Sequence, residues 1–321
     1  MKFIEDYILF VERNLANLNL PNKPVNLYEP ISYFLKLGGK RIRPVLTLLS
    51  AELFGNEKES AINAAIAVEL FHNFTLIHDD IMDESKLRRG EKTVHEKWDN
   101  NIAILSGDVL FVNSYKFLQK QKASDLSKLF FCFNDMAEKL CEGQQMDMDF
   151  EKLKLVEQDS YLEMIKLKTS VLLGCALEMG AIIAQASKAD RKLMYDFGVN
   201  IGMAFQIQDD ILDLYGDSEL IGKRVGGDVI NNKKTILNVS AYKLANTKQR
   251  DLLFHYSEIK DEDLKVNSFK NIYDELNILD YCNNLRLEYY ESAISNLKAL
   301  SVHSENSKLS LLAKELMNRK K

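Results

Sequence analysis

INAAIAVELFHNFTLIHDDIMD, residues 62–83, places an acidic motif at the end of a long apolar segment. The segment lies inside a helix that we predict near residues 58–84, since apolar residues recur at helical spacing. At about 100° per residue, Asp79, Asp80 and Asp83 fall on one helix face, at the C-terminal end where the helix dipole disfavours negative charge. Three carboxylates held in this way repel one another unless a cation binds them.

A second acidic motif repeats this pattern. Asp209, Asp210 and Asp213 end another predicted helix, near residues 188–215, again with apolar residues upstream. Carboxylates together with substrate phosphates are the usual ligands of Mg²⁺. A single DDxxD motif is typical of a solvated acidic surface, but two copies, each at the end of an apolar helix, favour binding of divalent metal.

Cationic residues form three clusters beside these motifs: Lys40, Arg41 and Arg43 in GGKRIRP (38–44), Arg88 and Arg89, and Lys223 and Lys233. The first cluster lies at a predicted helix start, where free backbone N–H groups already favour anions. The third lies in a charged loop that holds four of the 14 glycines. Together, the acids and the cations predict a pocket for two diphosphates, one bound through Mg²⁺ and one bound directly by Lys and Arg.

Composition limits the class of protein. The chain has 321 residues with only 14 Gly and 4 Pro, so we predict long helices and one all-α domain over residues 1–321. The net charge of −5 argues against wholesale binding of nucleic acid. Four cysteines without CxxC spacing indicate free thiols in a reducing compartment. The longest apolar stretch, Val171–Ala186, is too short for a membrane span, so we expect a cytoplasmic protein with no transmembrane segment.

Taken in order, the motifs resemble those of the trans-isoprenyl diphosphate synthases, the farnesyl and geranylgeranyl diphosphate synthase family. The resemblance runs through GGKRIRP (38–44), HNFTLIHDDIMDESKLRRG (72–90), GQQMD (143–147), Lys168-Thr169 and the segment 205–235. It implies an isoprenoid-synthase-type helical bundle around a deep central cavity, with the two aspartate motifs facing each other across it. It also implies a transferase that condenses isopentenyl diphosphate with dimethylallyl, geranyl or farnesyl diphosphate and releases diphosphate.

The resemblance assigns roles to individual residues. Three Mg²⁺ ions are expected to be held by Asp79, Asp80, Asp83, Asp209, Asp210 and Asp213. Allylic diphosphate is expected to be bound by Arg88, Lys168, Lys223 and Lys233, and isopentenyl diphosphate by Lys40, Arg41, Arg43, His72 and Arg89. The catalytic residues, which shield the allylic cation, are expected to be Lys168, Thr169 and Gln206. Gln144 and Asp147 match supporting positions, but as ordinary helix residues they stay outside the candidate set.

Product length depends on the residues below Asp79, because the growing chain runs along the helix at about 1.5 Å per residue. Phe71, Phe74 and Thr75 are the candidate chain-length residues. Thr four positions and Phe five positions before the motif are similar to geranylgeranyl synthases, although a helical wheel turns Phe74 towards core packing. We expect a C20 product, geranylgeranyl diphosphate, with farnesyl diphosphate (C15) or a longer polyprenyl diphosphate left open.

Three other interpretations compete with this one. A terpene cyclase also ionises diphosphates at DDxxD, but such enzymes typically lack GGKRIRP. A catalytically silent regulatory subunit loses one or both aspartate motifs, and both are intact here. A plain helical scaffold leaves the positioned charges unexplained. By resemblance we also expect a homodimer, and Arg319-Lys320-Lys321 is either a cover for the isopentenyl diphosphate site or a solvated terminus.

Overall fold

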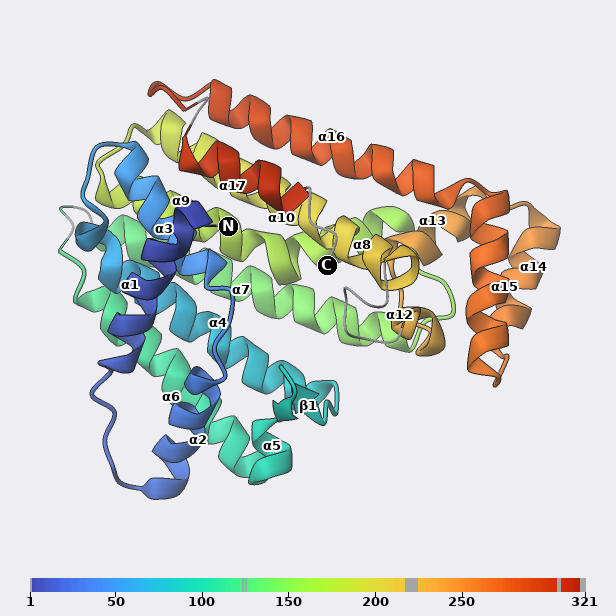
Figure 1. Cartoon of the computed structure of the whole chain (residues 1–321), viewed down its shortest axis with the longest axis horizontal. Helices are drawn as coiled ribbons and strands as arrows, with labels where there is room; N and C mark the ends of the chain where they lie inside the picture. The colour runs from blue at the N-terminus through green and yellow to red at the C-terminus, as the bar shows by residue number, and fades with distance from the viewer. Residues whose placement is uncertain (1, 123, 125, 217–224, 305–306, 318–321) are drawn as a thin grey trace. The chain divides into compact units, whose positions relative to one another are not determined.

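The chain is almost entirely helical in a computed structural model, which describes residues 2–122, 124, 126–216, 225–304 and 307–317 (Figure 1). This confirms the predicted all-α class. Contacts divide the chain into two compact units, Met1–Phe133 with Ala176–Lys192, and Asn134–Cys175 with Leu193–Lys321. The single domain over residues 1–321 and its deep central cavity stay predictions.

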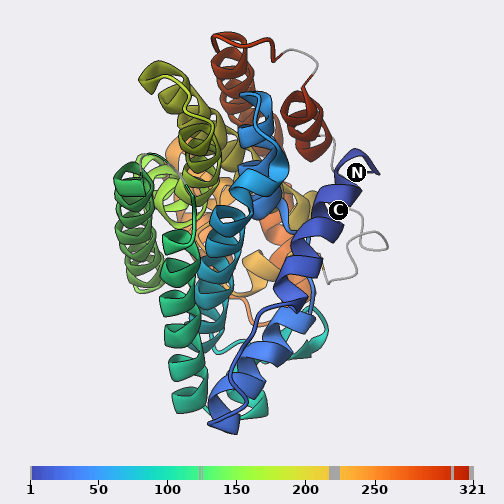
Figure 2. The same cartoon turned by 90° about the vertical axis from the view of Figure 1, so that its left-hand side faces the viewer.

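The first unit holds the N-terminal helices, a small hairpin and parts of three helices that continue into the second unit. Its elements are η1 (Lys2–Ile4), α1 (Glu5–Ala16), α2 (Val25–Lys36), α3 (Ile42–Leu53), η2 (Lys58–Ala61), α4 (Ile62–Met82), β1 (Leu87–Arg88), β2 (Glu91–Lys92), α5 (Val94–Lys97), α6 (Asn100–Gln119), and parts of α7 (Leu126–Glu151), α9 (Val171–Ile183) and α10 (Lys188–Tyr215). Within it, α4 packs along α6 and against α3 (Figure 2).

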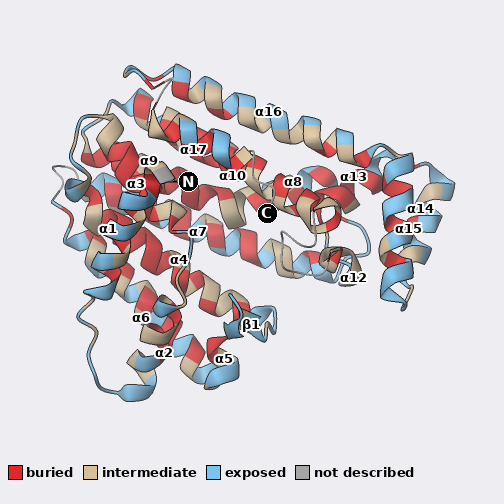
Figure 3. Ribbon diagram, viewed as in Figure 1, coloured by how far each residue is buried: buried red, intermediate tan, exposed pale blue. Residues whose placement is uncertain are grey.

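Helix α4 is the buried helix of this unit (Figure 3). Residues 64–71 are buried on every side of the helix and are apolar except for Glu69, and a helix of that kind is stable only when other elements surround it. By length and composition alone, Lys58–Met82 is the one helix among the described residues that is able to cross a membrane, and 67% of its apolar window is buried inside the structure. The sequence pattern predicts a helix here, near residues 58–84, but the apolar stretch that it singles out as the longest is Val171–Ala186.

A β-hairpin stands where the sequence pattern predicts only a charged loop. β1 and β2 pair antiparallel, with Leu87 opposite Lys92. The two turn residues, Arg89 and Gly90, have φ values of 56° and 82°, which is the left-handed conformation that a two-residue type I′ turn needs. Each strand has only two residues, too few for an alternating pattern to be recognised.

The second unit holds the remaining parts of α7, α9 and α10. Its other elements are α8 (Gln158–Ile165), the π-helix η3 (Lys166–Ser170), α12 (Gly227–Ile230), α13 (Ile236–Leu244), α14 (Thr247–Ser257), α15 (Glu262–Glu275), α16 (Ile278–Lys298) and α17 (Lys308–Met317). Helical periodicity in the sequence predicts one continuous helix near residues 234–256. Instead, Asn246 and Gln249 form a capping box that starts α14 as a separate helix, because each side chain bonds the other residue's backbone N–H.

One apolar cluster holds the second unit together. The cluster joins the buried side of α10, including Ile207 and Ile211, to α8, α13, α15 and α16. Helices α14 and α15 carry much of their surface exposed (Figure 3). Burial of one side of α10 fixes the rotation of this helix, and therefore the side on which its aspartates lie.

Candidate active site

The basic loop between α2 and α3 is built from backbone conformations that most residues avoid. Gly38 and Gly39 have φ values of 76° and 150°, and Arg41, the N-cap of α3, has a φ of 50°. The left-handed conformation costs a non-glycine residue energy, so contacts made by Arg41 must compensate for it. Pro44 lies in the first turn of α3, as its sequence position predicts.

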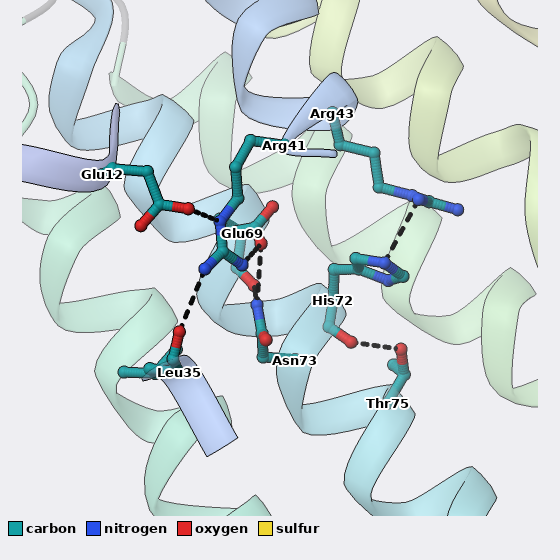
Figure 4. A network of polar contacts seen from close by, with 8 residues as sticks. All are labelled: Glu12, Leu35, Arg41, Arg43, Glu69, His72, Asn73 and Thr75. Atoms are coloured by element: carbon teal, nitrogen blue, oxygen red, sulfur yellow. Dashed lines mark hydrogen bonds and ion pairs between the residues drawn. The ribbon is translucent and has the colours of Figure 1, made fainter. Parts of the chain in front are cut away.

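The side chain of Arg41, which the resemblance assigns to isopentenyl diphosphate, is bonded to groups of the protein. Its side chain is 0% exposed, and its Nε donates to Glu12 Oε1 at 2.7 Å. Nη1 donates to Glu69 Oε1 at 2.6 Å, and Nη2 donates to the Leu35 carbonyl oxygen at 3.0 Å (Figure 4). The side chain of Arg41 is therefore enclosed and binds two acids of the protein.

Arg43 and His72 contact each other in the same unit. Nη1 of Arg43 lies 3.2 Å from Nε2 of His72 (Figure 4). A guanidinium can only donate, so Nε2 accepts, and the neutral ring carries its proton on Nδ1. Burial and the positive charges of the nearby arginines lower the pKa of His72 well below its ordinary value. The buried Nε of Arg43 has no hydrogen-bond partner among the described residues, so this donor is available.

Arg89 lies against the basic loop. A Cβ added to Gly39 would come within 2.9 Å of the Arg89 guanidinium, so only glycine allows this approach. Burial and repulsion from Arg41 lower the pKa of Arg89, an effect that Glu69 opposes. Lys40 is exposed on the same loop. The structure therefore brings Arg43, His72 and Arg89 together, as predicted for one anion site.

The first aspartate motif ends α4. Asp80 is 1% exposed and receives three hydrogen bonds from Arg88: from Nε at 2.9 and 2.8 Å and from Nη2 at 2.7 Å. Burial raises the pKa of Asp80, and Arg88 opposes the rise. Asp79 is half-buried, and Asp83, the C-cap, is exposed. The middle carboxylate is thus committed to Arg88, while the outer two are more accessible.

The second aspartate motif, on α10, has the same arrangement. Asp210 is buried and accepts hydrogen bonds from the Tyr161 hydroxyl at 2.5 Å, the Ile236 N–H at 2.9 Å and Gln206 Nε2 at 3.2 Å. Burial raises the pKa of Asp210 to about 7, although these donors oppose the rise. Asp209 and Asp213 are half-buried. Tyr161 was not among the predicted site residues, since nothing in its local sequence marks it.

The loop after the second motif returns to it. The Asp213 carboxylate accepts the N–H of Asp228 at 3.0 Å, and its backbone carbonyl accepts the N–H of Gly226 at 2.7 Å. Lys233 is exposed, with its Nζ 3.9 Å from Asp228. The predicted ligand Lys223 lies outside the described residues, as does the tail 318–321.

Lys168 and Thr169 lie in the π-helix η3, a distortion that is frequent at functional sites. Two glycines let neighbouring helices approach it closely. A Cβ on Gly143 would clash with the Lys168 backbone, and one on Gly202 would press on Ser170. Lys168 Nζ pairs with Asp147 Oδ2 at 2.5 Å. Asp147 is not among the candidate site residues, but it contacts Lys168, which is one of them.

The carboxylates fit Mg²⁺ in kind, because this ion prefers oxygen ligands. Within the part of the chain that the structure describes, no three His, Cys, Asp or Glu side chains converge as a ready metal site. Mg²⁺ is usually held by one or two protein carboxylates together with substrate phosphates. The outer aspartates of each motif, which are less buried than the middle ones, are able to supply such carboxylates. Asp80 and Asp210 are more deeply buried than the outer aspartates and are bonded to protein donors.

Phe71 lies one helical turn before Thr75 on α4 and belongs to an aromatic cluster. Phe71 is fully buried, with its ring centroid 5.4 Å from Phe74, 6.0 Å from Phe111 and 5.2 Å from Phe133. Thr75 donates its hydroxyl hydrogen to the His72 carbonyl at 2.9 Å. The sequence pattern on α4 finds Phe71, Phe74 and Thr75, but it misses Phe111 and Phe133 because they come from α6 and α7.

Comparisons with known proteins agree over nearly the whole length. The sequence model of the family described as polyprenyl synthetase matches residues 24–276. A geranylgeranyl pyrophosphate synthase of Geoglobus acetivorans is 36% identical over 320 residues, with 99% of this chain and 98% of that protein covered. A geranylgeranyl diphosphate synthase of Saccharolobus solfataricus is 38% identical, with 99% of each chain covered. The crystal structure of geranylgeranyl pyrophosphate synthetase from Pyrococcus horikoshii superposes with a TM-score of 0.94 at 33% identity, over 99% of this chain and 98% of that one.

Proposed function

Because the chain belongs to the polyprenyl synthetase family, we propose that it condenses isopentenyl diphosphate with allylic diphosphates and that its main product is geranylgeranyl diphosphate. It is accordingly a prenyl-transferring enzyme. The family covers both units of the chain, and relatives 36–38% identical to it are geranylgeranyl diphosphate synthases.

One observation from the first unit supports this function most strongly. Helix α4 carries a buried cationic site at His72 and an acidic motif that starts at Asp79. Seven residues, or two turns, separate them, which is about 10 Å along the helix. A direct anion site and a metal-type carboxylate site on one helix suit two diphosphate substrates that must react with each other.

We propose that both aspartate motifs bind Mg²⁺, with three ions in the complete site, as the family resemblance implies. The accessible carboxylates are those of Asp79, Asp83, Asp209 and Asp213, and we assign the direct metal contacts to them. Asp80 and Asp210 support these contacts through their bonds to Arg88 and Tyr161. When bound, Mg²⁺ supplies Lewis acidity that stabilises charge on the departing diphosphate.

The residues of the chain then bind and orient the substrates and shield the allylic cation. Arg43, Arg89 and the Nδ1–H of His72 hold isopentenyl diphosphate, with Lys40 on the same loop. The C–O bond of the allylic diphosphate breaks, the double bond of isopentenyl diphosphate attacks the resulting cation, and a proton leaves to regenerate an allylic product. Lys168, Thr169 and Gln206 are proposed to shield the cation. Gln206 donates its Nε2 hydrogen to Asp210, so its carbonyl oxygen is the end suited to face positive charge.

We propose a C20 product. In this proposal, the growing prenyl chain runs along α4 past Thr75 and stops at the ring of Phe71. On an ideal helix, Thr75 and Phe71 lie within about 80° of Asp79, so they follow one another down the same face. Phe71 is held in place by rings from α6 and α7. Farnesyl diphosphate and longer products are the alternatives that product sizing separates.

We also propose a homodimer and cytoplasmic location. Ile104, Leu105 and Val112 are exposed apolar side chains within about 100° of one another around α6, and Phe131 on α7 is 76% exposed. In sedimentation velocity, wild type is expected to be a dimer and Leu105→Asp a monomer. Leu252→Asp, which changes an exposed leucine on α14, is the matched control. A monomeric wild type would refute the proposal.

The reaction itself is tested by incubating the protein with Mg²⁺, isopentenyl diphosphate and each of the three allylic primers, followed by sizing of the products. Elongation ending at C20 is the expected outcome. No elongation with any primer would overturn the function, and cyclised hydrocarbon would indicate a terpene cyclase.

A further inference from the structure

One buried guanidinium fastens the basic loop to two helices. Arg41 bridges Glu12 on α1 and Glu69 on α4, and the Glu69 side chain is 3% exposed (Figure 4). Oε1 of Glu69 also accepts a hydrogen bond from Asn73 Nδ2 at 2.9 Å. We call Arg41, Glu69, Glu12 and Asn73 the buried clamp.

The buried clamp joins the two segments that carry the anion-binding pair. Arg41 lies two residues before Arg43, and Glu69 lies one helical turn before His72. The Arg41–Glu69 ion pair therefore sets the distance between the two backbones from which Arg43 and His72 meet. Figure 4 shows the two contacts beside each other, Arg41 with Glu69 and Arg43 with His72.

The two acids of the clamp, Glu12 and Glu69, also place negative charge beside several arginines that lie close together. Burial lowers the pKa of Arg43, and the charge of Glu69 opposes this shift. Arg41 and Arg88 repel Arg89, whereas Glu69 and Glu12 attract it. Before a diphosphate arrives, such charges repel one another, so the buried Glu69 and the partly exposed Glu12 beside them reduce the tendency of the loop to open.

We propose that Arg41 and Glu69 are positioning residues for isopentenyl diphosphate, holding Arg43 and His72 in their binding arrangement before the substrate arrives. The inference rests on the proposed function. A loop that is already in place loses little freedom on binding, so the clamp lowers the KM for isopentenyl diphosphate. We expect it to act on one substrate only, because the bonds of Arg41 and Glu69 run to Glu12, Leu35 and Asn73 and away from the aspartate motif of α4.

Glu69→Gln is the first test, because it keeps the size of the side chain and removes its charge. We expect the KM for isopentenyl diphosphate to rise at least tenfold, while kcat and the KM for the allylic substrate stay within twofold. Titration calorimetry with isopentenyl diphosphate alone should show the same loss of affinity. Tyr7→Phe is the control, since it removes a hydrogen bond between α1 and α3 without touching the clamp.

A double variant separates positioning from stability. Arg41→Met with Glu69→Leu replaces a buried ion pair by apolar side chains, a change that often leaves stability unaffected. If the clamp positions the loop, the KM for isopentenyl diphosphate stays raised at least tenfold even when Tm equals that of wild type. If the clamp only stabilises the fold, KM recovers with Tm, and the inference is wrong.

The outcomes for wild type keep the two proposals apart. A wild type that elongates no primer overturns the proposed function. A wild type that elongates primers normally, with Glu69→Gln and the double variant both within twofold of its KM for isopentenyl diphosphate, overturns the positioning role alone. If the double variant does not fold, the KM values and calorimetry of Glu69→Gln decide the question.

Discussion

Arg88 binds Asp80 through two of its guanidinium nitrogens: Nε contacts the two carboxylate oxygens at 2.9 and 2.8 Å, and Nη2 contacts Oδ1 at 2.7 Å. The contact joins the hairpin strand β1 to the last turn of α4. It holds a buried carboxylate in its charged form next to two aspartates that remain accessible. The hairpin is therefore fastened to the acidic end of α4 rather than being a simple surface loop.

Replacing Arg88 by lysine should weaken this connection. A lysine ammonium is a point charge and cannot reproduce the planar contact of Nε and Nη2 with the two carboxylate oxygens. We therefore expect a loss of about 1–3 kcal/mol in the free energy of unfolding. We also expect a KM for the allylic diphosphate about tenfold higher. Urea denaturation and steady-state kinetics measure both, and an unchanged unfolding free energy would show that the contact contributes little.

Removing an accessible aspartate should abolish turnover but keep the fold. Asp79→Ala and Asp209→Ala are each expected to lower kcat by about 10²–10³-fold, since charge on the leaving diphosphate loses stabilisation. Circular dichroism should remain that of wild type. Asp135→Ala, which removes an acid paired with Lys139 on α7, is the control and should retain activity. Near-normal turnover in either active-site variant would contradict the metal assignment.

The stability of the metal-free protein should fall as pH rises between about 4 and 7. Asp210 has a pKa of about 7 in the folded protein against an ordinary value of 3.8, so in this window the folded state holds a proton that the unfolded state has lost. The contribution is complete below pH 4 and is lost as pH passes 7, with a slope of up to about 1.4 kcal/mol per pH unit. Asp210→Asn should remove this slope in urea denaturation with EDTA present. The prediction fails if the variant and wild type have the same pH dependence.

Opening the aromatic cluster should lengthen the product. Phe71→Ala removes the ring that meets Phe74, Phe111 and Phe133, so we expect products longer than C20, at a stability cost of about 3–5 kcal/mol. Phe111→Ala tests the same cluster from α6. Phe269→Ala is the control, because Phe269 is equally buried but packs on Tyr256 and Tyr273. Unchanged products from Phe71→Ala and Phe111→Ala would place the stop elsewhere.

The helices and the motifs on them were predictable from the sequence because both depend on local order. The spacing of Asp79, Asp80 and Asp83 puts them on one helical face whatever surrounds the helix. The same holds for Pro44 in the first turn of α3 and for the glycines of the basic loop. The two-residue strands of the hairpin and the break at Asn246 were missed, because each depends on a few side-chain and backbone bonds.

Only the tertiary structure decided which charged residues are open to a ligand. Sequence alone places Arg41 beside Arg43 in one basic cluster, but Glu12 and Glu69, which lie 29 and 28 residues away in the chain, bind its buried side chain. In the same way, Tyr161 and the Ile236 backbone determine that Asp210 is enclosed. Whether a charged side chain is open to a ligand depends on the residues that bond to it and cover it. Those residues come from distant segments of the chain, which meet only when the helices pack.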